Sequence, residues 1–220
     1  MQLAKAVGLT TVDVELIRVG EVDCIVVERF DRLRSEDGSV TRVHQEDICQ
    51  ALGYPPDQKY ELAGRGRLGR GGGPEFCDIA SLLDRYALSP LEELDKLTRA
   101  ATFTALIGNS DAHGKNYALL HDGYGRVTLA PLYDTVPTIL FPRLKDEAAM
   151  TIGGAVDLSA VDTAAIRREA KHWRVSADRM VDQALQFAES LAAAASKLDK
   201  SSAVRQLVER RSEQFLTSGS

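Results

Sequence analysis

Two aspartates and an asparagine between residues 108 and 135 have the types and spacing that phosphoryl transfer requires. Asp111 and Asn116 form the pattern D-x-x-x-x-N within GNSDAHGKN, and Asp134 follows in LAPLYDT. This chemistry needs a carboxylate that accepts a hydroxyl proton, and oxygen ligands that hold Mg²⁺ against phosphates. The three side chains together can supply both functions, so we predict that they converge on one divalent ion in a cleft.

The elements around these residues are suited to position them. Ser89-Pro90-Leu91-Glu92 has a Ser N-cap, a Pro at the first helical position and a Glu that can close a capping box, which predicts a firmly placed helix ending near Ile107. Its expected buried positions are Leu91, Leu94, Leu97, Ala101 and Ala105.

A hairpin is expected after the loop, with strands at 117–120 and 126–129 joined at Asp122-Gly123, and it returns the chain to Asp134. His113 and Lys115 lie between the proposed ligands and could contact phosphate oxygens, which would add positive charge there. Any one of these residues alone is more typical of an ordinary turn, so the prediction depends on the joint pattern. Pro131 and Tyr133 stay open between packing and nucleotide contact.

The rest of the chain predicts an α+β fold that is mostly helical. Residues 1–9 resemble the last turns of a helix, and alternating residues from Val12 predict a hairpin with a turn at Gly20-Glu21 that leads into a buried strand. A short helix is expected at 45–52, with Ile48 and Cys49 inside, and His44 is interpreted as a cap or packing residue rather than a ligand. Periodic segments at 160–172, 177–198 and 202–216 predict helices.

Composition limits the possible functions. The 220 residues carry a net charge of −5, which disfavours non-specific binding to nucleic acid or anionic lipid. Three widely spaced cysteines indicate neither a disulfide framework nor a thiolate zinc site. We found no leader or membrane-spanning segment in the sequence, so we expect a soluble cytoplasmic protein.

The motifs VERFDR (27–32), HQEDICQALG (44–53), KYE (59–61), GNSDAHGKN and LAPLYDT occur in an order that resembles the HipA-like serine/threonine kinases, toxins of bacterial toxin–antitoxin systems. The resemblance covers nearly the whole chain and implies the C-terminal lobe of a kinase-like fold related to lipid kinases. It also implies ATP and Mg²⁺ as cofactors, a protein substrate such as an aminoacyl-tRNA synthetase, and a HipB-like antitoxin as partner. No sequence-specific nucleic-acid binding and no membrane association are expected.

The resemblance also assigns roles to individual residues. Asp111 would be the catalytic aspartate, and Asn116 and Asp134 would bind magnesium. The residues expected to contact the nucleotide are Glu28, Arg29 and Phe30 of a hinge, with His113, Lys115, Asn116, Tyr133 and Asp134. The implied organisation is a remnant of the N-terminal lobe with the hinge at 1–32, the C-terminal lobe at 33–216 and a disordered tail at 217–220.

Two parts of a complete kinase are not found in these 220 residues: the glycine-rich loop over the phosphates and the strand lysine that bridges them. Relatives carry both before the segment that begins at Met1. GRGRLG (64–69) matches G-x-G-x-x-G, but it lies downstream of the hinge and is interpreted as a decoy. Arg65, Arg67 and Arg70 could steer an anionic substrate, or the loop could simply be solvated.

Three functions therefore remain open. The first is a HipA-like kinase that uses Mg-ATP to phosphorylate a serine or threonine hydroxyl of a protein. The second is a truncated or split kinase that acts as a binding module. The third is a metal-dependent phosphohydrolase built on Asp111, His113, His121 and Asp134.

Overall fold

The computed structural model describes residues 1–61, 72–144 and 147–219. Its α-helices are α1 (Gln2–Ala6), α2 (Ile48–Leu52), α3 (Phe76–Tyr86), α4 (Pro90–Ile107), α5 (Thr163–Trp173), α6 (Ala177–Ala195) and α7 (Ala203–Thr217). Its strands are β1 (Val14–Val19), β2 (Val22–Val27), β3 (Arg32–Arg34), β4 (Val40–Arg42), β5 (Gln45–Asp47), β6 (Ala118–His121), β7 (Val127–Leu129), β8 (Glu147–Ile152) and β9 (Ala155–Asp157). The four 3₁₀ turns in the described residues are η1 (Pro56–Gln58), η3 (Gly114–Asn116), η4 (Thr138–Leu140) and η5 (Leu158–Ala160).

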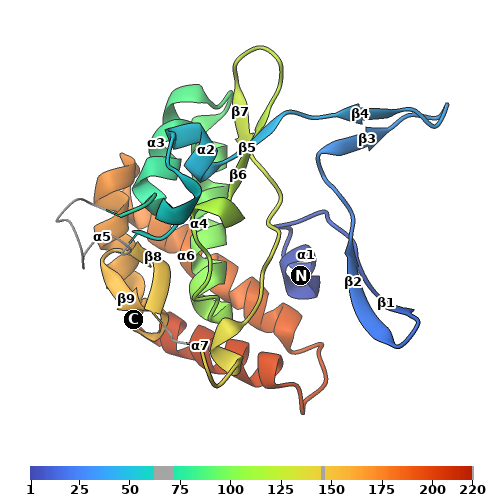
Figure 1. Cartoon of the computed structure of the whole chain (residues 1–220). Coiled ribbons are helices and arrows are strands. Elements are labelled where there is room, and N and C mark those ends of the chain that lie inside the picture. Colours follow the sequence, from blue (N-terminus) through green and yellow to red (C-terminus); the bar gives the residue numbers. More distant parts are fainter. Residues whose placement is uncertain (62–71, 145–146, 220) are drawn as a thin grey trace.

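The larger helices gather on one side of the molecule, and the hairpins β1–β2 and β3–β4 extend from the other side (Figure 1). The main core lies among the helices, where Ile79 of α3, Leu97 of α4, Ile166 of α5 and Leu191 of α6 are fully buried. The α+β, mostly helical fold and the last three helices agree with the sequence prediction. Three further elements, α3 and the hairpins β3–β4 and β8–β9, were not predicted.

Helix α4 forms where its sequence predicts it, but two details of the prediction were wrong. Ser89 occupies the N-cap position without a side-chain capping hydrogen bond, so the start is set by Pro90 and by backbone bonds to the Ser89 carbonyl. Leu91, in the first turn, is 55% exposed, whereas Leu94 and Leu97 are buried.

The C-terminal end of α4 is held from two sides, which places the loop that follows it. Gly108 adopts a left-handed conformation with φ of +67°, and Nη1 of Arg211 in α7 donates to the Ala105 carbonyl oxygen over 2.7 Å. Thr138 binds both sides of this junction: its Oγ1 donates to the Gly108 carbonyl over 3.0 Å and accepts from the Ser110 N–H over 2.7 Å. The loop from 108 to 116 therefore begins from a rigid point.

Gly108→Ala is expected to lower the free energy of unfolding by about 2–3 kcal/mol. An added Cβ would meet the Ile139 side chain at 2.4 Å. The alanine backbone would also have to adopt the left-handed conformation, which L-residues disfavour. Gly123→Ala is the matched control, because its φ is +79° and no atom lies within 4 Å of an added Cβ. Urea denaturation should show a loss of only about 1 kcal/mol for that control. Equal losses in the two variants would contradict the packing part of the argument.

The segment 45–52 was predicted as one helix but forms a strand followed by a helix. Residues 45–47 pair with β6, and Asp47 then caps α2 in a reciprocal box with Gln50. Ile48 and Cys49 are buried as expected. The paired residues of β6 lie 71 to 75 positions further along the chain, so local propensity could not indicate them. The resulting sheet has the order β5-β6-β7, and its β6–β7 hairpin confirms the prediction.

The hairpin β1–β2 forms with the predicted turn, but its second strand is not buried. In β2, Val22 is 63% exposed and Ile25 is 68% exposed, and Leu16 of β1 is 79% exposed, because the ribbon has two strands and no described element covers its apolar side chains. The tail also differs from expectation: Thr217 belongs to α7, and the Ser218 carbonyl accepts a 2.7 Å hydrogen bond from Oγ1 of Thr163. Within the described part of the chain, no helix combines the length and apolar character needed to cross a bilayer.

Candidate active site

Asn116 and Asp134, the two predicted metal ligands, are in direct contact. Nδ2 of Asn116 donates to Oδ2 of Asp134 over 2.7 Å, and Oδ1 of Asn116 accepts from the backbone N–H of His113 over 3.2 Å. The turn η3 directs Asn116 inward after the loop, and the β6–β7 hairpin brings the chain back to Asp134. Residues 18 positions apart therefore meet at one point.

Asp134 has an unusual backbone conformation, with φ of +52°. The left-handed region is energetically unfavourable for residues other than glycine, although less so for aspartate and asparagine than for most. Such a conformation persists only where the surroundings impose it, and it is concentrated at functional sites. Asp134 is exposed to solvent, and its carboxylate contacts the buried Asn116.

Asp111 lies at the start of the same loop, exposed to solvent, and it is oriented by Tyr60. The Tyr60 hydroxyl donates to Oδ1 of Asp111 over 2.8 Å. Burial, followed by this hydrogen bond and the negative charge of Asp111, raises the pKa of Tyr60 to about 12. The phenol therefore stays protonated at neutral pH and remains a donor to the carboxylate.

His113 is buried, and its environment corrects the role predicted for it. Burial and the nearby Lys59 ammonium lower the pKa of His113, so the imidazole is neutral at pH 7, although Asp111 and Asp134 act in the opposite direction. Nζ of Lys59 lies 2.7 Å from Nε2 of His113. The positive charge beside the aspartates is therefore carried by Lys59, not by His113.

Lys115 also differs from its predicted role as a phosphate contact. Its Nζ forms a 2.8 Å ion pair with Oδ2 of Asp47, at the N-terminus of α2. The Tyr133 hydroxyl donates to the Lys115 carbonyl oxygen over 2.7 Å, and burial raises the pKa of Tyr133. These contacts tie the loop to β5 and to the segment before Asp134.

A cavity of about 270 Å³ lies beside this cluster. The predicted hinge residues Glu28, Arg29 and Phe30 line it together with Tyr133. The rings of Phe30 and Tyr133 have centroids 5.6 Å apart, at an interplanar angle of 35°. The remaining lining residues are Val12, Val27, Asp31, Gln45, Asp47, Gln50 and Ala118. The predicted hinge residues and Tyr133 thus line the same cavity, and Tyr133 directly precedes Asp134 in the sequence.

Arg29 points its guanidinium at Asp31, which is buried between two arginines. The Asp31 side chain is 3% exposed, Nη2 of Arg29 lies 2.6 Å from its Oδ2, and Arg32 also pairs with it. Hydrogen bonds from Arg29, and then from Arg32, lower the pKa of Asp31 to about 2 against an opposing effect of burial. The guanidinium of Arg29 is therefore engaged with Asp31, and Arg29 lines the cavity with its other atoms.

This ion pair predicts a pH dependence of stability. The folded pKa of about 2 lies below the ordinary value of 3.8, so the stabilisation is fully present above pH 4 and is lost as the pH falls toward 2. Asp31→Asn should cost about 2 kcal/mol of unfolding free energy at pH 7, and the difference from wild type should shrink below pH 4. Urea melts across pH 2–7 would measure it, with Asp23→Asn on the exposed strand β2 as control. A pH-independent difference would contradict the assignment.

The triplet 59–61 was quoted in the sequence resemblance without a role, and it supplies three contacts to the site. Lys59 approaches His113, Tyr60 holds Asp111, and Glu61 accepts a 2.7 Å hydrogen bond from Oγ1 of Thr151 in β8. Burial raises the pKa of Glu61. In the sequence, these contacts are indicated only by three consecutive polar residues after Pro55-Pro56. That pattern does not show which residues they contact.

The phosphohydrolase set is not brought together. His121 lies at the end of β6, with its Nε2 2.9 Å from Oε2 of Glu46. In the described residues, the group of three or more His, Cys, Asp and Glu side chains with metal-binding geometry is His44, Glu46 and His121, which excludes Asp111 and Asp134. The G-x-G-x-x-G match and Arg65, Arg67 and Arg70 lie outside the described residues.

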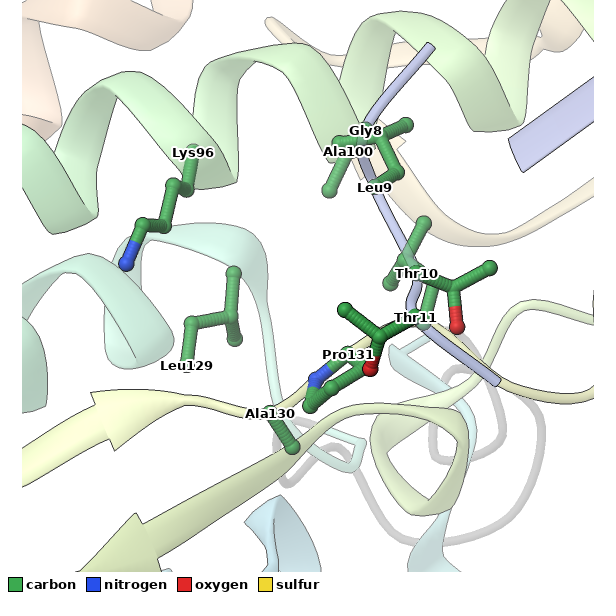
Figure 2. Close-up of a pocket in the computed structure, with 10 residues that line it drawn as sticks. Gly8, Leu9, Thr10, Thr11, Lys96, Ala100, Leu129, Ala130 and Pro131 are labelled. Carbon is green, nitrogen blue, oxygen red and sulfur yellow. The ribbon is translucent and has the colours of Figure 1, made fainter. Parts of the chain in front are cut away.

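A second pocket, of about 160 Å³, contains none of the predicted catalytic or metal residues. Figure 2 shows it between α4, which carries Lys96 and Ala100, and the segment from Gly8 to Thr11. Pro131 lines this pocket, and the Leu132 N–H donates to the Leu9 carbonyl over 2.9 Å. Pro131 is therefore placed away from the cavity that Tyr133 lines.

The donors at Asn116 and Asp134 fit a magnesium ion. Both side chains carry oxygen, which Mg²⁺ prefers, and the exposure of Asp134 leaves room for the waters that this ion retains. The carboxamide oxygen of Asn116 and the carboxylate of Asp134 would be the ligands of such an ion.

The family model for the HipA-like C-terminal domain matches residues 1–209. The chain belongs to this family. HipA of Shewanella oneidensis, a serine/threonine-protein kinase toxin, is 33% identical over 166 residues, which are 73% of this chain and 38% of that protein. Y4mE of Sinorhizobium fredii, whose name describes a kinase, is 44% identical over 162 residues, covering 74% of this chain and 36% of Y4mE.

Solved structures agree with this HipA-like assignment. The complex of Shewanella oneidensis HipA with HipB and operator DNA contains a chain that matches with a TM-score of 0.79 and 26% identity, over 99% of this chain and 53% of that one. The Helicobacter pylori kinase CtkA matches with a TM-score of 0.50 at 10% identity, over 99% and 82%, which supports the kinase-like fold alone. The HipA-like chain thus spans about two fifths to one half of its HipA and Y4mE relatives.

Proposed function

We propose that this chain forms the large lobe of a HipA-like serine/threonine kinase, which transfers the γ-phosphoryl group of ATP to a protein hydroxyl. The observation that carries the proposal is the continuity between Tyr133, which lines the hinge cavity, and Asp134, which contacts Asn116. A nucleotide bound in that cavity would have its phosphates directed toward two oxygen ligands. Membership of a family whose Shewanella member is a named serine/threonine kinase toxin supports this reading.

Asp111 is assigned the role of accepting the proton from the attacking hydroxyl. Its Oδ1 is held by Tyr60, so Oδ2 remains for the substrate, and its exposure allows a protein chain to approach. Lys59 supplies a positive charge beside the loop, where the phosphates would gather negative charge. When bound, Mg²⁺ would neutralise charge on the β- and γ-phosphates, held by Asn116 and Asp134.

The hinge cavity is assigned to the adenine base. Phe30, Tyr133 and Val27 provide apolar and aromatic surface, and the backbone of residues 28–30 borders the same space. A flat heterocycle is held by such surfaces, while backbone N–H and C=O groups determine its orientation. This chemistry favours a nucleotide over an unspecific apolar ligand.

The proposal is tested by comparing two chains for ATP-dependent phosphorylation. The 220 residues alone should show no measurable transfer to themselves or to added protein. A chimera that carries the part of Shewanella HipA lying N-terminal to its matched segment should be active. Positioning of the phosphates is worth about 7–11 kcal/mol in such reactions, which explains the large expected difference. An inactive, folded chimera would contradict the kinase proposal, and robust turnover by the 220 residues would contradict the need for upstream parts.

Partners follow from the relatives and are part of the proposal. The Shewanella structure contains HipA with HipB and operator DNA, so we propose a HipB-like antitoxin as partner in the cytoplasm. The phosphorylated target, for which the resemblance suggests an aminoacyl-tRNA synthetase, remains a prediction.

A second candidate function is a split kinase, in which this chain binds a separate small lobe. The exposed apolar residues of β1–β2 favour it, because Leu16, Val22 and Ile25 would be covered by further strands. Pull-down with the separately expressed upstream lobe of Shewanella HipA would test it. Leu16→Lys should abolish the capture, and capture that this charge leaves unchanged would contradict the candidate.

A further inference from the structure

We propose that His44, Glu46 and His121 form a binding site for a transition-metal dication, with Zn²⁺ as the best fit. The three residues each offer one ligand atom, and these atoms all lie within 4.8 Å of one another. The imidazole rings have centroids 4.6 Å apart, and Oε2 of Glu46 lies 2.9 Å from Nε2 of His121. The site is separate from the Asn116–Asp134 pair and requires no assumption about phosphoryl transfer.

The arrangement results from the strand register, not from a chance meeting of surface side chains. β5 and β6 pair with Gln45 opposite Leu120, and the His121 N–H donates to the His44 carbonyl over 3.0 Å. His44 and His121 are therefore directly opposite each other, and Glu46 is two residues along on the same face. The backbone has already brought three ligands to one side of the sheet.

The donor set selects the class of metal. Two imidazole nitrogens and one carboxylate oxygen suit Zn²⁺, Co²⁺ or Ni²⁺, whereas Mg²⁺ prefers oxygen alone. Tetrahedral bonds of about 2.0–2.1 Å place ligand atoms about 3.4 Å apart, so closure from the observed spacing requires only small side-chain rotations. His44 is exposed and Glu46 half-buried, which leaves them free to rotate and leaves a fourth position for water.

An ion pair between His121 and Glu46 is the simpler interpretation, and it leaves two features unexplained. Nε2 of His121 is buried, and its approach to Glu46 lacks hydrogen-bond geometry. The pair also gives no role to His44, whose ring lies against that of His121. A dication at the meeting point of the three groups accounts for both features.

A metal ion bound here would link β5 and β6, the two strands that flank the candidate active site. β5 ends at Asp47, which pairs with Lys115, and β6 begins two residues after Asn116. His44 directly follows the segment that returns from β4. Metal binding would fasten this return segment to the lobe and stabilise the strand pair in its register.

Zinc binding to the untagged 220-residue chain would test the site, by titration calorimetry and by thermal unfolding with and without Zn²⁺. We expect one ion per chain and an upward shift of the melting temperature. His121→Ala and Glu46→Gln should weaken binding by more than roughly tenfold, because even changes outside the ligand set cost about 10–100-fold. His172→Ala, which removes an exposed histidine on α5, should leave affinity and shift unchanged.

Cobalt spectroscopy identifies the ligands independently of stability. Co²⁺ should produce the visible bands of a nitrogen and oxygen site without a thiolate charge-transfer band, and the bands should be lost in His44→Ala but retained in Asp134→Asn. Circular dichroism would establish that each variant is folded. Absence of saturable binding, persistence of binding in folded His121→Ala, or loss of binding in His172→Ala would each overturn the proposal.

Discussion

Asp111→Asn is expected to lower the turnover number of the active chimera by about 10²–10⁴-fold, with little change in the melting temperature. The substitution keeps the size of the side chain and an oxygen that can accept from Tyr60, but it removes the carboxylate that we propose takes the hydroxyl proton. Because Asp111 is exposed, the loss of its charge should cost little folding free energy. Radiolabelled phosphate transfer from ATP to protein would measure the effect.

The matched control for this experiment is Asp84→Asn in α3, which changes an exposed aspartate away from the hinge cavity and the Asp134 cluster. It should retain full activity. The Michaelis constant for ATP should also stay nearly constant in Asp111→Asn, since the aspartate is assigned to the hydroxyl and not to the nucleotide. Turnover of Asp111→Asn within threefold of wild type would remove Asp111 from the mechanism.

Asp134→Asn is expected to weaken the apparent affinity for Mg²⁺ by more than about tenfold and to lower kcat/KM by about 10²–10³-fold. One negative charge is lost at the point where the cation would be held, while asparagine tolerates the φ of +52° about as well as aspartate does. The variant therefore tests charge with little added backbone strain. Activity measured across a magnesium titration would separate a metal effect from a general loss.

Asp182→Asn, at an exposed position of α6, is the control for the magnesium titration and should match wild type. Excess Mg²⁺ should restore part of the Asp134→Asn activity, because a weakened site can still be filled by mass action. An unchanged magnesium dependence together with reduced turnover would assign Asp134 to a role other than metal binding.

Much of the helical lobe was predictable because its information is local. Helices α5, α6 and α7 follow from apolar residues at intervals of three and four, and α4 from its Pro90 start and the Gly108 stop. The predictions were wrong where the local conformation or burial depends on a segment that is distant in the sequence. Residues 45–47 became a strand because β6 lies beside them, and β2 stayed exposed because no described element covers it.

The periodicity of the sequence predicted the mostly helical α+β lobe, and the order of its motifs indicated the family that the family model shows. The spacing also predicted that Asn116 and Asp134 lie together, and the two side chains are in contact, while their role as metal ligands stays a prediction. Only the tertiary structure decided that Lys115 pairs with Asp47, that Lys59 and Tyr60 reach the loop at 108–116, and that His44 meets His121. The reason is physical: spacing along the chain constrains which residues share a turn or a face, whereas the partner of a long polar side chain depends on which segments pack together.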